Sequence, residues 1–192
     1  MSGLHYKTWI GEHFSQKRIF NKKILILGES HYADGAEDKT ELLIKETMSG
    51  RFKHPFYTKL VLSFLEEENA AQLSLDRKVF FWQSVAYNNF VQDYLDQSRQ
   101  APSHEMWERG RNAFYELLEQ VKPDIVFVCG YRLWDQLPHK FRVESEKIGS
   151  LFTITYQYKD ISAQCVRSKH PSANYSPAAV YSNLESFLGK TI

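Results

Sequence analysis

Short runs of consecutive apolar residues recur along the chain, with stretches of helical spacing between them. Such runs are typical of strands that are buried on both faces. The runs that we predict to form the core of a sheet cover residues 23–27, 79–85, 125–129 and 163–168. Residues 151–158 are also rich in strand-forming side chains, and we expect them to pair with 161–168 as a hairpin.

Helix-starting signals lie between these runs. Asp38 is a candidate N-cap, and Pro55 suits the first turn of a second helix. Ser103 and Ser176 precede two further segments with one apolar face each, and a short helix is expected over 131–137. Strands that alternate with helices imply right-handed crossovers. The predicted fold is therefore an α/β/α sandwich of three layers around a central four-stranded, mostly parallel sheet, in a single domain of residues 1–192.

Charge and cysteine content narrow the possible functions. The net charge is +1, which argues against a polybasic nucleic-acid binder. Cys129 and Cys165 both lie in apolar runs, so we expect buried free thiols in a reducing compartment. Two cysteines cannot supply a four-cysteine zinc or iron–sulfur site, and we expect no metal or other cofactor. Neither a signal peptide nor a membrane span is expected, which favours a cytoplasmic protein.

The first polar cluster follows the strand predicted at 23–27. Gly28 allows the chain to turn sharply there, and the next ten residues read ESHYADGAED. In parallel sheets, ligands bind beyond the carboxyl ends of the strands. Glu29, His31 and Asp34 are therefore candidates for acid–base chemistry or metal binding. The alternative is a polar loop that only caps the following helix.

A second candidate is His170, which follows the last predicted strand and precedes Pro171 and Ser172. A neutral imidazole held in such a loop can donate a hydrogen bond to a developing anion. A loop histidine without any role is the commoner case.

Aromatic and amide side chains complete the candidate site. Phe52 or Phe56 could stack on a flat ligand, although a helix-entry loop with one buried Phe is the commoner explanation. Gln83 interrupts an apolar run, and its carboxamide offers the donor and the acceptor that an imide edge requires. A strand-end amide bonded to backbone is the alternative for Gln83.

Taken together and in this order, these segments resemble the uracil-DNA glycosylase superfamily. The similarity runs from about Ile24 to Leu188 and rests mainly on KPDIVFVCGYRLWDQL and on HPS before the last helix. It implies a pocket for an extruded base and hydrolysis of the N-glycosidic bond of a deaminated or damaged, uracil-like base, as in base-excision DNA repair. The implied partner is DNA or a free nucleobase or nucleotide, and the oligomeric state stays open.

The resemblance also implies roles for single residues. His170 would steady the anion of the departing base, and Gln83 lies where the family has a base-reading asparagine. Phe52 or Phe56 would stack on the base, and Tyr32 would exclude a 5-methyl group.

The remaining expected site residues concern the water and the sugar. Ser30 stands where several subfamilies have an aspartate or asparagine that positions water, and Glu29 or Asp34 could replace that group. Ser172, within the HPS segment, is expected on the substrate side of the pocket.

Two other functions remain open. Ser30 and Gln83 favour a non-catalytic nucleobase- or nucleic-acid-binding module on the same fold. Residues 28–31, Gly-Glu-Ser-His, also resemble the Gly-Glu-x-His element of erythromycin-esterase and Tiki-like hydrolases, in which Glu and His act as base or metal ligands.

Overall fold

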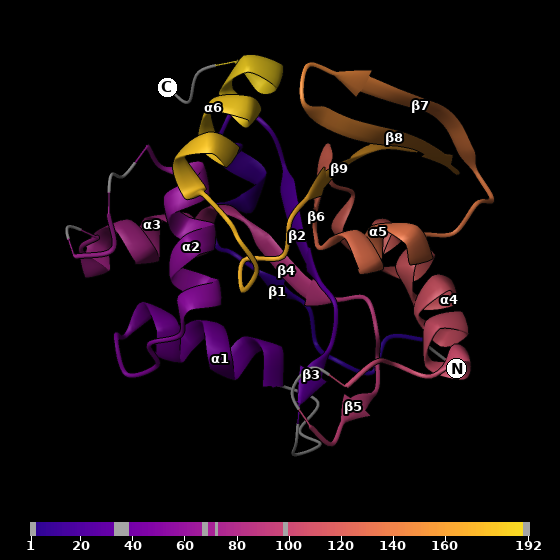
Figure 1. The fold of residues 1–192 in the computed structure, drawn as a ribbon, viewed down its shortest axis with the longest axis horizontal. Coiled ribbons are helices and arrows are strands. Elements are labelled where there is room, and N and C mark those ends of the chain that lie inside the picture. Colours follow the sequence, from indigo (N-terminus) through magenta and orange to yellow (C-terminus); the bar gives the residue numbers. More distant parts are fainter. Residues whose placement is uncertain (1–2, 33–38, 67–68, 72, 98–99, 190–192) are drawn as a thin grey trace.

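A mixed seven-stranded sheet runs through the computed structural model, and helices cover both of its faces (Figure 1). The structure describes residues 3–32, 39–66, 69–71, 73–97 and 100–189. In spatial order the strands are β1 (Trp9–Ile10), β4 (Ala86–Asn89), β2 (Ile24–Gly28), β6 (Ile125–Cys129), β9 (Ile161–Ser168), β8 (Leu151–Tyr158) and β7 (Arg142–Ile148). Two short strands, β3 (His31–Tyr32) and β5 (Tyr94–Leu95), pair separately.

The α/β class is confirmed, but the predicted four-stranded, mostly parallel sheet is wrong. β4, β2, β6 and β9 pair in parallel, whereas β1, β8 and β7 add antiparallel strands at the two edges. The antiparallel extension has a local cause. Tight turns at Gly149 and Lys159, both with positive φ, join β7 to β8 and β8 to β9, and a tight turn can connect only antiparallel neighbours.

The described residues form six α-helices, five of which begin at or close to an expected signal. They are α1 (Lys39–Met48), α2 (Pro55–Phe64), α3 (Leu75–Ser84), α4 (His104–Val121), α5 (Tyr131–Gln136) and α6 (Pro177–Leu188), and a 3₁₀ turn covers Phe14–Gln16. Ser103 and Ser176 precede α4 and α6 as expected, and their side chains cap these helices by accepting from the backbone N–H groups of Met106 and Ala179. Asp38 lies outside the described residues.

The strand predicted at 79–85 is instead the second half of α3. Ser74 caps this helix by accepting from Arg77 N, and Val79 is exposed on its outer side. Phe81 and Trp82 are buried, so the apolar run marks one face of a helix and not a strand. A short apolar run fits either structure equally well, which explains the error. The strand itself, β4, begins immediately afterwards at Ala86.

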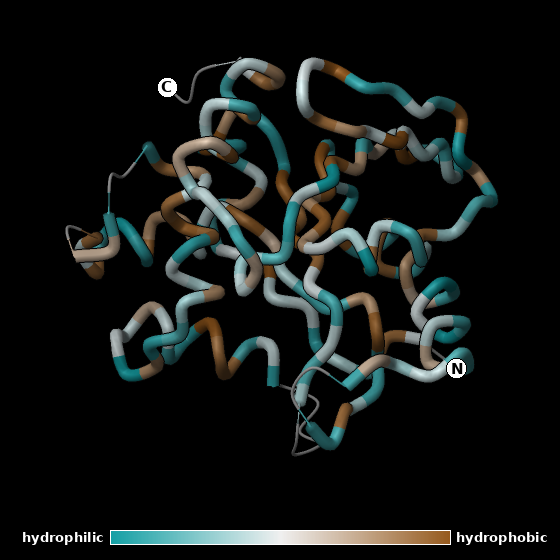
Figure 2. The backbone as a smooth tube through the Cα atoms, in the orientation of Figure 1, coloured by the Kyte–Doolittle hydropathy of each residue, from teal (hydrophilic) through white to brown (hydrophobic). Residues whose placement is uncertain are grey.

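Alternate residues of the central strands enter two apolar clusters on opposite sides of the sheet. Ile26 packs with α2, α3 and α6, whereas Leu25 and Leu27 pack with α4 and α5. Figure 2 shows the hydrophobic segments concentrated around these central strands.

Cys129 and Cys165 are buried free thiols as predicted, and burial raises the pKa of both. Among the described residues, no helix combines the length and apolar composition that crossing a bilayer requires.

Candidate functional site

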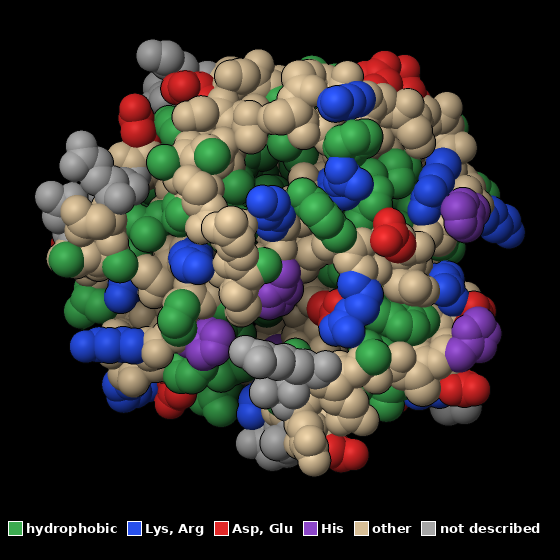
Figure 3. Space-filling view, viewed as in Figure 1, with side chains coloured by type: hydrophobic (Ala, Val, Ile, Leu, Met, Phe, Trp, Pro, Cys, Tyr) green, Lys and Arg blue, Asp and Glu red, His purple; other side chains and the backbone are tan. Residues whose placement is uncertain are grey.

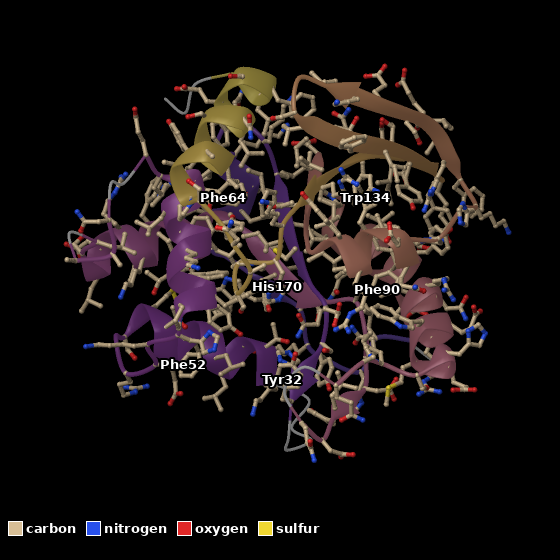
Figure 4. The ribbon with its side chains drawn as sticks, viewed as in Figure 1. Tyr32, Phe52, Phe64, Phe90, Trp134 and His170 are labelled. Carbon is tan, nitrogen blue, oxygen red and sulfur yellow. The ribbon has the colours of Figure 1, made fainter. Side chains whose placement is uncertain are left out.

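A cleft of about 750 Å³ opens at the carboxyl ends of the parallel strands. Figure 3 shows a hollow near the middle of this face, and Figure 4 places His170 at its centre with Tyr32 and Phe52 farther out. Eight of the candidate residues from the sequence line the cleft. They are Glu29, Ser30, His31, Tyr32, Phe52, Phe56, His170 and Ser172.

Two predicted site residues are not part of this cleft as the structure describes it. Gln83 lies on α3, where its Oε1 accepts from the backbone N–H of Glu12 at 2.8 Å, so its expected base-reading place is wrong. The cause is the helix that replaces the predicted strand, because it directs the amide toward the N-terminal segment. Asp34 lies outside the described residues.

His170 is held in one orientation by its own loop. Its Nδ1 accepts from the backbone N–H of Ser172 at 3.1 Å, so the neutral ring carries its proton on Nε2. Burial lowers the pKa of His170, and the nearby Glu29 charge opposes that shift. Lys59 fixes the loop from α2, because its Nζ donates to the carbonyl of Pro171 at 2.9 Å. The ring therefore presents an N–H donor at neutral pH.

Asn89, at the carboxyl end of β4, lines the cleft and was not predicted from the sequence. Its Oδ1 accepts from the Tyr87 hydroxyl at 3.1 Å, and its Nδ2 finds no partner among the described residues although the side chain is 2% exposed. A buried amide donor without a partner costs about 1–3 kcal/mol, so this atom is a natural place for a ligand oxygen. The polar pair Asn88-Asn89 after an apolar run was the available signal.

Gly28 makes room for Asn89. A Cβ at Gly28 would lie 2.1 Å from Asn89 Oδ1 and 2.8 Å from the Tyr87 hydroxyl oxygen. The two strands pair with Gly28 opposite Asn89, so the amide lies across the face of the glycine. The glycine expected to allow a turn therefore also allows this close approach.

Glu29 forms an ion pair with Arg132, which lies in the first turn of α5. Arg132 Nε donates to Glu29 Oε2 at 2.9 Å, and Arg132 Nη2 donates to Oε1 of the same carboxylate. The Ser30 Oγ is buried and has no partner among the described residues. The bidentate pair fixes the carboxylate at the cleft edge, and the Ser30 hydroxyl can bond to a ligand or a water.

Aromatic rings form one wall of the cleft. The Phe56 ring lies 5.2 Å from the His170 ring, and the Phe52 and His54 rings stack with an interplanar angle of 9°. The sequence left open whether Phe52 or Phe56 lies at the site, and both contribute to this wall.

The candidate metal ligand His31 is buried, and its Nε2 lies 2.8 Å from Thr40 Oγ1. Within the described ranges, no three His, Cys, Asp or Glu side chains are grouped so that they could bind a metal ion.

No protein-family model matches the chain, and no curated protein matches its sequence.

Proposed function

We propose that this protein hydrolyses the N-glycosidic bond of a uracil-like base, as a divergent member of the uracil-DNA glycosylase superfamily. One observation carries the proposal. Asn89 Nδ2 and His170 Nε2 are two hydrogen-bond donors of one cleft that make no hydrogen bond to any described residue. An aromatic wall that includes Phe56 lies beside them. Two donors and a ring face are what a flat base with two carbonyl oxygens requires.

The base is read by the amide at the end of β4. Asn89 Nδ2 donates to one carbonyl oxygen of the base, and the second lone pair of Oδ1 accepts from the imide N–H. Phe56 stacks against the ring, and Tyr32, which is 41% exposed, stands at the entrance of the cleft. The role that the resemblance gave to Gln83 passes in this proposal to Asn89.

Bond cleavage leaves the bonding electron pair on the base. His170 Nε2–H donates to the oxygen on which that charge collects, and the sugar acquires oxocarbenium character. Water then forms the new bond to the sugar carbon, and its proton neutralises the departing base. The Ser30 hydroxyl orients this water, and the Glu29 carboxylate at the cleft edge opposes the positive charge of the sugar. No cofactor takes part in this scheme.

The test is cleavage of oligonucleotides that contain uracil, hypoxanthine, xanthine or hydroxymethyluracil, single- and double-stranded, scored for abasic sites. We expect His170→Ala to lower the rate on the preferred base about 100- to 1,000-fold, as loss of one such donor does elsewhere. His139→Ala is the matched control, because His139 is exposed and does not line the cleft. Cleavage that persists unchanged in His170→Ala would contradict the mechanism.

A second candidate function is binding of nucleobases without catalysis. The observation that favours it is the bidentate pair with Arg132, because Glu29 is the only carboxylate among the described residues that line the cleft. A carboxylate held in this way is less able to activate water. The supporting result would be no cleavage of any base in the panel, together with uracil binding that Asn89→Ala weakens.

A further inference from the structure

A row of cations and aromatic rings lies next to the cleft. The Arg167 guanidinium carbon is 4.6 Å from the centre of the Tyr131 ring and 3.9 Å from that of Phe152. Phe152 lies on β8, between Arg167 on β9 and Lys147 on β7. Lys147 Nζ is 5.4 Å from the centre of the Phe152 ring. We call these four residues, Tyr131, Arg167, Phe152 and Lys147, the cationic strip. Stacking on a ring holds a cation in place while leaving its N–H groups directed outward.

Strand register keeps negative charge off the strip. Lys147 of β7 is directly opposite Phe152 of β8, so both side chains lie on the same face of the sheet. Glu144 and Glu146 are opposite Thr155 and Thr153, which alternate with Phe152 and lie on the other face. A segment of mixed charge, RVESEKI, is thereby sorted into a basic face and an acidic face.

The two cations of the strip have no anionic partner in the chain as described. Arg167 and Lys147 form no ion pair and no hydrogen bond with any described residue. By contrast, Arg109 and Arg132 are each paired with a carboxylate. The rings of the strip are also open to solvent, since Tyr131 is 48% and Phe152 37% exposed. The strip therefore combines unused donors with exposed apolar surface.

The strip begins at the mouth of the cleft. Tyr131, the first residue of α5, lines the cleft and also stacks with Arg167. Figure 3 shows Lys and Arg side chains interspersed with hydrophobic ones on the face that carries the hollow. A chain molecule whose one unit enters the cleft would therefore continue over the strip.

We propose that the cationic strip binds the phosphodiester backbone of single-stranded DNA next to the base held in the cleft. The inference rests on the proposed function, which supplies the base. The Arg167 fork suits phosphate oxygens, Lys147 adds a second positive charge, and the exposed Tyr131 face can stack on a neighbouring base. The net charge of +1 is compatible, because the charge is segregated locally by strand register.

The experiment measures binding of a short fluorescent single-stranded DNA by anisotropy over a series of salt concentrations. We expect Arg167→Gln to weaken binding about 10-fold and to reduce the salt slope by about one phosphate contact. Lys147→Gln is expected to act in the same direction with a smaller loss. The matched control is Lys140→Gln, because Lys140 Nζ lies over the Phe141 ring at 4.8 Å in the same kind of contact, at the opposite end of β7. Uracil binding and thermal unfolding of each variant show that the cleft and the fold persist.

Three outcomes would contradict DNA binding by the cationic strip. They are equal weakening by Arg167→Gln and Lys140→Gln, DNA binding that does not depend on Arg167, and competition by a polyglutamate peptide that is as strong as competition by DNA.

The experiment also distinguishes failure of this inference from failure of the proposed function. DNA binding that depends on Arg167, with no cleavage of any base, would support the strip and contradict the glycosylase activity. Cleavage of a base, with DNA binding unchanged in Arg167→Gln, would support the glycosylase activity and contradict the strip.

Discussion

Two consecutive asparagines at the end of β4 face opposite sides of the sheet and have opposite hydrogen-bonding states. Asn88 Nδ2 donates to the Thr8 hydroxyl at 2.9 Å and to the Tyr6 carbonyl at 3.3 Å, and its Oδ1 accepts from the backbone N–H of Asn89 at 2.8 Å. Asn89 Nδ2, on the cleft side, has no partner among the described residues. Both side chains are almost fully buried.

The difference distinguishes an amide that is satisfied within the fold from one that is not. The N-terminal segment satisfies the Asn88 amide through Tyr6 and Thr8. The Asn89 Nδ2 donor is buried without a partner among the described residues, which costs free energy of folding. Residue type and burial are nearly identical at the two positions, so only their hydrogen bonds distinguish them, and the proposed function assigns base recognition to Asn89.

Among the substitutions that test this comparison, Gly28→Ala should have the largest effect. The new Cβ would require Asn89 and Tyr87 to move, and a displacement of about 1 Å can lower a reaction rate roughly 100-fold. Overpacking should also lower the free energy of unfolding by about 1–3 kcal/mol. Cleavage assays and chemical denaturation measure both effects. Gly149→Ala is the control for cleavage, since nothing lies within 4 Å of a Cβ there. Its positive φ makes this substitution strain the turn between β7 and β8, so we expect a loss of stability without a loss of cleavage, and an equal loss of cleavage would refute the steric explanation.

Asn88→Ala should act on stability. The substitution removes the acceptor of the buried Asn89 N–H and the donor to the Thr8 oxygen, although the Thr8 hydroxyl still donates to Gln120. We therefore expect the free energy of unfolding to fall by about 1–3 kcal/mol. The affinity for uracil should stay unchanged. Denaturant titration and calorimetric binding measure the two quantities. A large loss of affinity at unchanged stability would reverse the assigned roles.

Asn89→Ala should act on binding. We expect uracil to bind about 10-fold more weakly, because the ligand loses its buried hydrogen-bond partner. The free energy of unfolding should change by less than about 0.5 kcal/mol, because two contributions offset each other. The substitution removes the unsatisfied Nδ2 donor, which stabilises the fold, and it also removes the acceptor of the Tyr87 hydroxyl, which destabilises it. The same two measurements apply, and strong destabilisation with normal affinity would contradict the comparison.

The smallest effect concerns pH and His170. Burial lowers the pKa of His170 below its ordinary value of about 6.5, so the unfolded chain binds this proton more readily than the folded one. The stability that neutral His170 contributes is complete at pH values above about 6.5. It is lost as the pH falls from there toward the lower pKa of the folded state. His170→Gln should flatten this part of the stability profile, measured by thermal unfolding across that range. An unchanged stability profile in His170→Gln would show that folding does not lower the pKa of His170.

Much of the framework could be predicted from the sequence, because buried parallel strands leave a direct apolar signature. The strand at Ile125–Cys129 and the hairpin formed by Leu151–Tyr158 and Ile161–Ser168 agree with the prediction. The strand β4 was missed because half of its four residues are asparagines, whose burial depends on partners distant in the sequence. The exposed edge strand β7 was missed because its side chains give no apolar run.

The candidate site was predictable where a residue directly follows a strand. Glu29, Ser30 and His170 lie in the cleft for this reason. Gln83 was misplaced because periodicity could not distinguish the end of a strand from the end of a helix. Asn89 and Arg132 were not found because their roles come from contacts across the sheet, with Tyr87 and Glu29 respectively.

The alternation of side chains along β4 also makes this site sensitive to chain length. β4 pairs with β2 so that Asn88 is opposite Leu27 and Asn89 opposite Gly28. Inserting one residue before this pair, without a compensating bulge, would move Asn88 to the position opposite Gly28, on the cleft side. Because Asn88 carries the same side chain as Asn89, the cleft would keep an amide at that position. The repeated residue thus gives the cleft a tolerance to a register error that a single asparagine would lack.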